Sequence, residues 1–366
     1  MKLKFSLDWL LIFVPVAVAM KYVPALHNDL WLFFCSCVAI IPVAGLMGRA
    51  TEHLAERVGS GVGGLLNATF GNAAELIIAL MALHKGLTDV VKASITGSII
   101  GNILLVFGLS ALVGGVKYKE QRFNRTAAQT ATTSLFLAAI ALLIPSVFHY
   151  SAGLSPGMWT PALEQKLSLA ISVVLFGTYL CTLFFSLHTH KQLYVGTHDE
   201  THAATPKKAA WPIGKAMLLL TVSTVVVAFL SEFLVGTVEA AQARLGVTEV
   251  FIGVVLVAIV GNAAEHSTAV WMAARNKMDL SIGIAAGSSL QVALLIAPVC
   301  VFASYFIGKP MDLEFTIPEI VAVVAAVVIL GEIANDGESN WLEGVQLISV
   351  YLILGILFFF LPAVKH

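Results

Sequence analysis

Long apolar stretches separated by short polar ones cover almost the whole chain. A helix needs about 20 apolar residues to cross the hydrocarbon core of a bilayer. The stretches that reach or approach this length lie at 6–25, 29–49, 61–83, 89–115, 126–147, 166–187, 213–241, 248–273, 279–307, 314–333 and 344–363. The pattern therefore predicts an all-α polytopic membrane protein with about 11 transmembrane helices.

One polar stretch, 188–211, is much longer than the others and is rich in His, Asp, Thr and Pro. This composition cannot build an apolar core and is typical of a linker. It divides the chain into an N-terminal helix at 1–28, a first half at 29–187, the linker and a second half at 212–366. A metal site or a pH sensor in the linker stays an alternative to simple solvation, carried by His188, His190, His198, Asp199, Glu200 and His202.

The sequence Gly-Asn-Ala-Ala-Glu occurs twice, at 71–75 and at 261–265, each time inside a long apolar stretch. A charged side chain at the bilayer centre costs at least ~2.5 kcal/mol and usually faces a protein interior or a water-filled path. An asparagine and a glutamate three residues apart share one helix face, and their oxygens suit Ca²⁺. The predicted functional centre therefore consists of Glu75, Glu265, Asn72 and Asn262.

The motif belongs to a larger repeat. A shift of 190 residues also overlays Ala79 on Ala269 and Gly97-Ser98 on Gly287-Ser288. The two motif helices are the third and the eighth spans, so they cross the membrane in opposite directions. This predicts two inverted five-helix repeats after one N-terminal helix, the architecture of secondary transporters, whose site lies near the midplane.

The helix that follows each motif adds further oxygen atoms. Ser98 and Asn102 are four residues apart, and Ser288 and Gln291 are three apart, so each pair shares a helix face. We predict these four side chains as ligands, although hydrogen bonds between helices are an alternative. The motif glycines, Gly71 and Gly261, are predicted to let two backbones approach and to free carbonyl ligands.

Asp89 and Asp279 open their helices and are predicted to be N-caps outside the site. Glu52 and Glu232 are candidates for a proton or cation relay, whereas Glu56 and Glu239 fit solvated helix ends. His266 follows Glu265 directly and suits proton coupling, with a packed core histidine as the alternative. The predicted proton-coupling set is Glu75, Glu265, Glu52, Glu232 and His266.

Composition supports the membrane class, because 58% of the residues are hydrophobic, only 12% are charged and the mean hydropathy is +0.89. Soluble domains have about 25% charged residues. No basic arm or patch of the kind that nucleic acid requires is present. The four cysteines lie in apolar stretches without the spacing of a metal site and are predicted to be small core residues, namely Cys35, Cys37, Cys181 and Cys300.

The distribution of Lys and Arg predicts the orientation. Eleven spans place fourteen of them on the side of the N-terminus and seven on the other, which predicts a cytosolic N-terminus. Compact loops favour a bacterial inner membrane. Lys2 and Lys4, followed by Ala17-Val18-Ala19, also fit a cleaved signal peptide.

The segments GNAAELIIAL, GSIIGN, GNAAEHSTAV and GSSLQ resemble the paired signature of the calcium/proton exchangers of the cation/calcium exchanger superfamily. The resemblance covers 51–116 and 231–300. It implies ten core helices in two inverted sets plus an N-terminal helix, with Ca²⁺ held between Glu75 and Glu265. Sodium/calcium exchangers of the same superfamily carry a serine- and proline-containing motif that is absent here, as is the acidic helix that some relatives have between the halves.

Two carboxylates that share a dry site cannot both stay ionised without a cation. The empty site is therefore expected to bind protons, and protons and Ca²⁺ compete for a pair that titrates as a unit. Alternating access turns this competition into export of cytosolic Ca²⁺ with inward proton flow. The expected partners are Ca²⁺, H⁺ and the lipid bilayer, with no cofactor and no nucleic acid, and a homo-oligomer is left open.

Three other functions are alternatives to Ca²⁺/H⁺ exchange. A Na⁺/Ca²⁺ or other cation/proton antiporter stays the main alternative. A channel would arrange its acids around a subunit axis, whereas the symmetry here is internal. An enzyme is not expected, since His53-Leu54-Ala55-Glu56 lacks the His-Glu-x-x-His order of a zinc protease.

Overall fold

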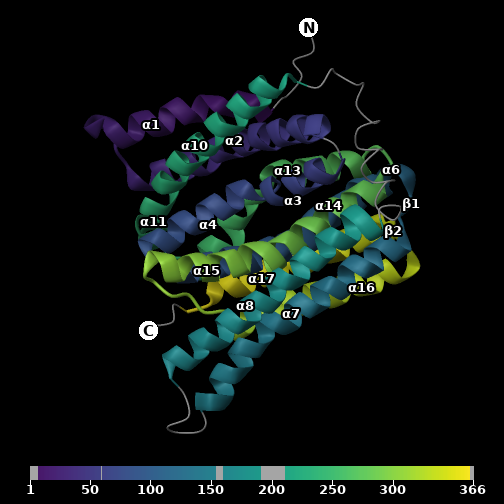
Figure 1. The fold of residues 1–366 in the computed structure, drawn as a ribbon. Helices are drawn as coiled ribbons and strands as arrows, with labels where there is room; N and C mark the ends of the chain where they lie inside the picture. The colour runs from purple at the N-terminus through teal and green to yellow at the C-terminus, as the bar shows by residue number, and fades with distance from the viewer. Residues whose placement is uncertain (1–6, 59, 154–159, 191–210, 363–366) are drawn as a thin grey trace.

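The computed structural model describes residues 7–58, 60–153, 160–190 and 211–362, and nearly all of them are helical (Figure 1). The α-helices are α1 (Phe13–Tyr22), α2 (Asp29–Val58), α3 (Ser60–Phe70), α4 (Ala73–Lys85), α5 (Thr88–Ile100), α6 (Phe107–Tyr118), α7 (Arg125–Gly153), α8 (Pro161–Phe184), α10 (Ile213–Gly236), α11 (Val238–Leu245), α12 (Glu249–Phe251), α13 (Ala258–Ala273), α14 (Met278–Gln291), α15 (Ala297–Ile307), α16 (Ile317–Asp336) and α17 (Trp341–Phe360).

Several α-helices continue into one another through turns of π-helix. These turns are η3 (Gly101–Val106), η4 (Phe185–Thr189), η6 (Ile252–Val257) and η7 (Val292–Ile296). Two 3₁₀ turns, η1 (Leu7–Ile12) and η2 (Pro24–Leu26), flank α1. Turns of π-helix inside α-helices occur frequently at functional sites, and three of the four lie on the helices that carry the repeated sequences.

Nine helical stretches in the described part of the chain are long and apolar enough to cross a membrane. They are Asp29–Val58, Thr88–Tyr118, Arg125–Ser151, Pro161–Thr189, Ile213–Gly236, Glu249–Ala273, Met278–Ile307, Ile317–Asp336 and Trp341–Phe360. The prediction of a polytopic helical membrane protein is confirmed, whereas the predicted number of eleven spans is not.

Three predicted spans are shorter than expected. The stretch at 6–25 contains only the ten residues of α1 between 3₁₀ turns. The stretch at 61–83 is interrupted at Gly71-Asn72, where Asn72 has φ −98° and ψ 24°, so α3 and α4 are separate helices of 11 and 13 residues. The seventh span also ends early, at Gly236, and α11 follows it as a helix of its own.

The prediction of an exclusively α-helical chain is wrong in one detail. The strand β1 (Glu120–Arg122) pairs antiparallel with β2 (Glu338–Asn340), with Gln121 opposite Ser339. Gln121 is buried and donates to the carbonyl of Ala273 at 2.9 Å. Three-residue strands leave no clear alternation in a sequence, so this link between the α6–α7 and α16–α17 connections could not be predicted.

Two further predictions need correction. Asp89 and Asp279 are not N-caps, because Leu87 and Lys277 occupy those positions and the aspartates lie in the first turn of α5 and α14. A carboxylate there still stabilises the helix dipole. Among the cysteines, Cys181 is exposed on α8, whereas the other three are buried as expected.

The buried apolar side chains form two clusters that meet at α4. One cluster lies around α2 and α10, and the other around α5 to α7 and α14 to α17. In Figure 1 α2 and α10 lie above α4 and α13, and α7, α15, α16 and α17 lie below them. Ala73, Ala74 and Ile78 of α4 belong to the upper cluster, and Ala79 and Leu83 belong to the lower one. Polar residues on α4 are thereby enclosed between two apolar cores.

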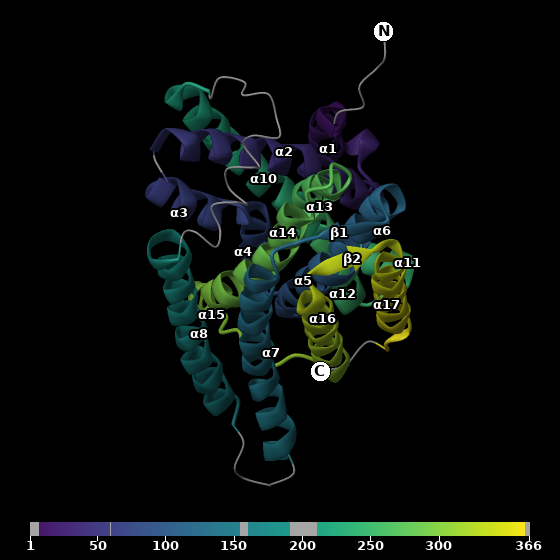
Figure 2. The same ribbon diagram turned by 90° about the vertical axis from the view of Figure 1, so that its right-hand side faces the viewer.

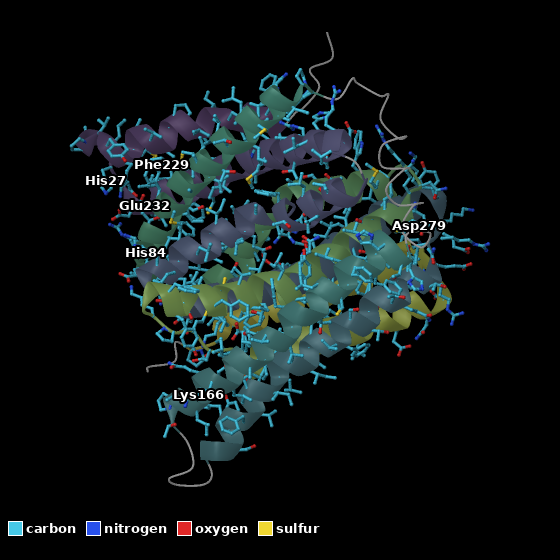
Figure 3. The ribbon with its side chains drawn as sticks, in the orientation of Figure 1. His27, His84, Lys166, Phe229, Glu232 and Asp279 are labelled. Carbon is cyan, nitrogen blue, oxygen red and sulfur yellow. The ribbon has the colours of Figure 1, made fainter. Side chains whose placement is uncertain are left out.

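The helices have two distinct ends, which Figure 3 identifies by labelled side chains. His27, His84 and Glu232 lie at one end, and Asp279 lies at the opposite end. The strands β1 and β2 share the end of Asp279 (Figure 1). The predicted linker at 188–211 falls outside the described residues except at its margins, so the proposed division into halves stays a prediction.

Candidate cation site

The two repeated sequences meet where the turn between α3 and α4 lies against α13. A Cβ atom added to Gly261 would lie 3.5 Å from the Cβ of Glu75, and one added to Gly71 would lie 3.6 Å from Oε1 of Glu265. The glycine of each motif therefore contacts the glutamate of the other. These are ordinary van der Waals distances, and the tighter constraint is at Gly71, where an added Cβ would lie 2.8 Å from the carbonyl of Asn67.

Glu75 is enclosed by polar groups from two neighbouring helices. It is only 3% exposed, and its Oε1 accepts hydrogen bonds from the Ser98 hydroxyl and, at 3.2 Å, from Nδ2 of Asn262. Nδ2 of Asn262 also lies 3.0 Å from the Ser98 hydroxyl. Within the described residues, Oε2 of Glu75 and Oδ1 of Asn262 are buried acceptors without a hydrogen-bond partner.

Glu265 has matching surroundings built from the first motif. The amide of Asn72, in the orientation that satisfies the carboxylate, donates to both oxygens of Glu265 at 3.1 and 3.2 Å and to the Ser288 hydroxyl at 3.1 Å. Gln291 completes this group, because in the same orientation the oxygen of Asn72 lies 3.1 Å from its side-chain amide. The asparagine of each motif therefore binds the glutamate of the other.

The charges of the site are concentrated. Glu75 and Glu265 lie near enough to repel each other, and Glu52 at the end of α2 adds to the repulsion on Glu265. No basic side chain is among the residues that contact either glutamate in the described structure. Buried charges need a partner of opposite sign or a metal ion, so the arrangement favours binding of a cation or of protons.

Asn102, a predicted ligand, and His266, predicted for proton coupling, contact each other and not the glutamates in the hydrogen bonds of the described structure. Oδ1 of Asn102 accepts a hydrogen bond from Nε2 of His266 at 3.0 Å. Nδ2 of Asn102 is buried and has no partner in the described part of the chain. Asn102 follows the start of η3, whose wider turn alters the spacing expected for an α-helix. Asn102 and His266 are therefore hydrogen-bonded to each other beside the site.

Glu232 is not brought to the site. Its side chain is exposed near the end of α10, on the side of His27 and away from Asp279 (Figure 3). The apolar stretch around it suggested deep burial, but α10 ends at Gly236, one turn later. Glu52, in contrast, lies close to Glu265 in space although it is exposed.

The buried carboxylate of Glu319 lies outside the predicted site. Glu319 is 2% exposed in the first turn of α16, where it forms a capping box with Thr316 and accepts from the Thr96 hydroxyl at 3.0 Å. The spacing Thr-x-x-Glu before an apolar stretch is the signal that could have identified it. This role accounts for its burial without a part in cation binding.

Known proteins similar to this chain share its length and its fold. The sodium/calcium exchanger protein family matches residues 28–188 and 215–360. A Ca²⁺/H⁺ antiporter of Aphanothece halophytica is 46% identical over 368 residues, which cover 98% of this chain and 97% of that protein. The Ca²⁺/H⁺ antiporter ChaA of Bacillus subtilis is 46% identical over 331 residues, with 90% and 92% covered.

Among solved structures, native YfkE superposes with a TM-score of 0.82 at 43% sequence identity and covers 97% of this chain and 100% of that one. The family match spans both repeated sequences, and the residues that form the site lie inside it. The chain therefore belongs to the sodium/calcium exchanger protein family.

Proposed function

We propose that this protein exchanges Ca²⁺ for H⁺ across a membrane, with Glu75 and Glu265 as the two halves of one site. The observation that carries the proposal is the pair of buried acceptors at the centre, Oε2 of Glu75 and Oδ1 of Asn262. An unsatisfied buried acceptor costs about 1–3 kcal/mol. A Ca²⁺ ion, which takes six to eight oxygen ligands, or a proton on Glu75 would remove that cost.

The hydrogen bonds also explain why one site can serve both ions. The amides of Asn72 and Asn262 donate to the ionised carboxylates, and Oδ1 of Asn262 stays available because it has no partner among the described residues. Ser98 and Ser288 hold the carboxylates in place from the adjacent helices. When Ca²⁺ leaves, protons neutralise the two repelling carboxylates, so each ion is released by the arrival of the other.

The near full-length similarity to Ca²⁺/H⁺ antiporters supports protons as the coupling ion. The proposal includes two inverted five-helix repeats after an N-terminal helix, with eleven membrane crossings. Nine crossings are the long helices, the tenth is α1, and the eleventh is the interrupted pair of α3 and α4. It also includes a cytosolic N-terminus, a bacterial inner membrane and Ca²⁺ export. Proton coupling through Glu52, Glu232 and His266 stays a prediction.

Flux measurements test the coupling ion. Purified protein in proteoliposomes should take up ⁴⁵Ca²⁺ when a pH gradient is imposed and should not do so when an equal Na⁺ gradient replaces it. Vesicles that contain the Glu75→Gln/Glu265→Gln double variant correct for leak. Uptake driven by Na⁺ alone would overturn the assignment of protons and favour the Na⁺/Ca²⁺ alternative.

A further inference from the structure

A second cluster of ionisable side chains lies away from Glu75 and Glu265, where α7, α8 and the segment 308–316 between α15 and α16 meet. His149 comes from α7, Glu164 from the first turn of α8 and Glu314 from the connecting segment. One ligand atom of each lies within 4.8 Å of the others. Figure 2 shows α7 and α8 side by side, with their connected ends protruding together.

The distances within this triad suit a metal ion. Nδ1 of His149 lies 3.2 Å from both oxygens of Glu164, and Nε2 lies 3.7 Å from Oε1 of Glu314. Zn²⁺ binds nitrogen and carboxylate oxygen at about 2.0–2.2 Å, so two ligands at corners of a tetrahedron lie ~3.3 Å apart. A single ion takes only one ring nitrogen of His149. Nδ1 of His149 and the carboxylate of Glu164 already have this separation, whereas Glu314 lies beside the other nitrogen and would turn its carboxylate toward the ion.

The backbone around Glu314 is fixed by the same two helices. The amide of Leu313 donates to the Ser168 hydroxyl of α8 at 2.9 Å, and the amide of Phe315 donates to the Ser146 hydroxyl of α7 at 2.8 Å. Ser146 lies one turn before His149, and Ser168 lies one turn after Glu164. The three ligands are therefore held in register before any ion binds, as a metal site requires.

The local charge favours a divalent cation. Glu164 is 4% exposed, and burial raises the pKa of Glu314, against the opposite effects of Lys92 and His149. Lys92 is engaged with Asp312 at 3.1 Å and with Asp89 at 3.9 Å. A protonated His149 would neutralise only one of the two carboxylates of the triad, whereas a divalent ion neutralises both.

We propose that His149, Glu164 and Glu314 form a second divalent-cation site, of the imidazole and carboxylate type that Zn²⁺ fills. Two of the ligands precede the linker and one follows it. A bound ion therefore links α7 and α8 to the connection between α15 and α16. Since α15 continues the helix of Ser288 and Gln291, the ion would restrain an element that carries part of the cation site.

Calorimetric titration with Zn²⁺ tests this site without any transport assay. The background protein carries Glu75→Gln and Glu265→Gln, which disable the central site, and Gln in place of the linker histidines His188, His190, His198 and His202. We expect about one Zn²⁺ per chain in this background. Adding His149→Gln should weaken the binding at least ~10-fold and should abolish the rise in unfolding temperature that Zn²⁺ causes.

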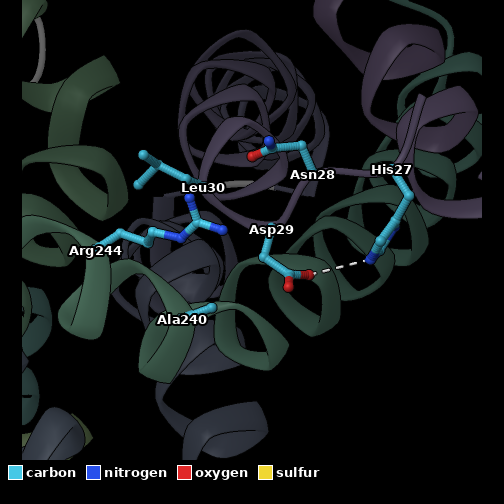
Figure 4. A pocket seen from close by; sticks show the side chains of 6 residues that line it. All are labelled: His27, Asn28, Asp29, Leu30, Ala240 and Arg244. Carbon is cyan, nitrogen blue, oxygen red and sulfur yellow. Dashed lines mark ion pairs between the residues drawn. The ribbon is translucent and has the colours of Figure 1, made fainter. Parts of the chain in front are cut away.

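His27→Gln is the matched control. His27 pairs with Asp29 at 3.1 Å in an exposed pocket beside Arg244 (Figure 4). The control substitution therefore removes a histidine next to a carboxylate elsewhere on the protein and should leave Zn²⁺ binding unchanged. Glu314→Gln, on the connecting segment, replaces His149→Gln if that variant does not fold. The proposal is overturned if the background binds no Zn²⁺, or if the triad variants bind it as tightly as His27→Gln does.

Discussion

At the scale of single residues, the asparagine of each repeated sequence donates a hydrogen bond to the glutamate of the other copy. Asn262 donates to Glu75, and Asn72 donates to Glu265. The sequence showed that Asn and Glu share a helix face, but the pairing across copies requires the two backbones to cross at Gly71 and Gly261. That crossing is a tertiary contact, and the periodicity of residues within one helix does not predict it.

Two adjacent serines on α14 allow a matched test of the predicted ligands. The Ser288 hydroxyl accepts from the amide of Asn72 at 3.1 Å, whereas Ser289, also buried, donates to the carbonyl of Ala285 at 2.9 Å. Ser288→Ala should weaken Ca²⁺ binding roughly tenfold, about 1.4 kcal/mol, because a hydrogen bond to the charged cluster is lost. Ser289→Ala should leave the Ca²⁺ dissociation constant within roughly twofold, since the bonds lost go to the backbone carbonyls of Ala285 and Ile99 and not to the charged cluster.

Calorimetric titration of both purified variants with Ca²⁺ at one pH makes this comparison. Equal losses in the two variants would mean that packing of α14, and not contact with Asn72, sets the affinity.

At the scale of elements, the sequence predicted the long helices well and the details of their backbones poorly. Ser98, Ser288 and Gln291 face the motif residues as the spacing indicated. Asn102 does not contact Glu75, because a turn of π-helix begins at Gly101. A π turn arises from packing between helices and leaves no distinctive pattern in the residues themselves.

The contact between α5 and η6 depends on glycines that permit close approach. A Cβ at Gly253 would lie 2.5 Å from the Cβ of Ala93 and 2.9 Å from the carbonyl of Val90. Gly253→Ala should therefore destabilise the protein by about 1–3 kcal/mol through overpacking. Gly283→Ala, on α14, meets nothing within 4 Å and should be neutral or stabilising by up to ~1 kcal/mol.

Thermal unfolding in detergent measures both substitutions. An unfolding temperature for Gly253→Ala equal to that for Gly283→Ala would show that α5 and η6 can separate without cost.

At the scale of the whole molecule, two segments with the same five residues have different backbones. The first is interrupted at Gly71-Asn72, whereas the second runs unbroken through Gly261 after the π turn η6. Glu75 is 3% exposed, while Glu265 is only half-buried and lies near the exposed Glu52. Unequal exposure of the two glutamates is what the proposed alternating-access cycle predicts for a state open to one side.

The central claim is that Glu75 and Glu265 form one site that takes either Ca²⁺ or protons. Each glutamine substitution keeps the shape of the side chain but removes one charge and one proton-binding group. Since a divalent ion in a low-dielectric site needs both negative charges nearby, each substitution should lower the exchange rate at least ~100-fold. Folding should survive, because a neutral amide is cheaper to bury than a carboxylate.

The most direct test measures ⁴⁵Ca²⁺ uptake driven by a pH gradient in proteoliposomes that contain Glu75→Gln or Glu265→Gln, with monodispersity checked before reconstitution. Glu338→Gln, at the surface in β2 where Glu338 pairs with Arg122, is the control and should transport at the unsubstituted rate. We expect both motif variants to lose exchange to nearly the same extent. Near-normal exchange by either folded variant would contradict a site shared by the two glutamates.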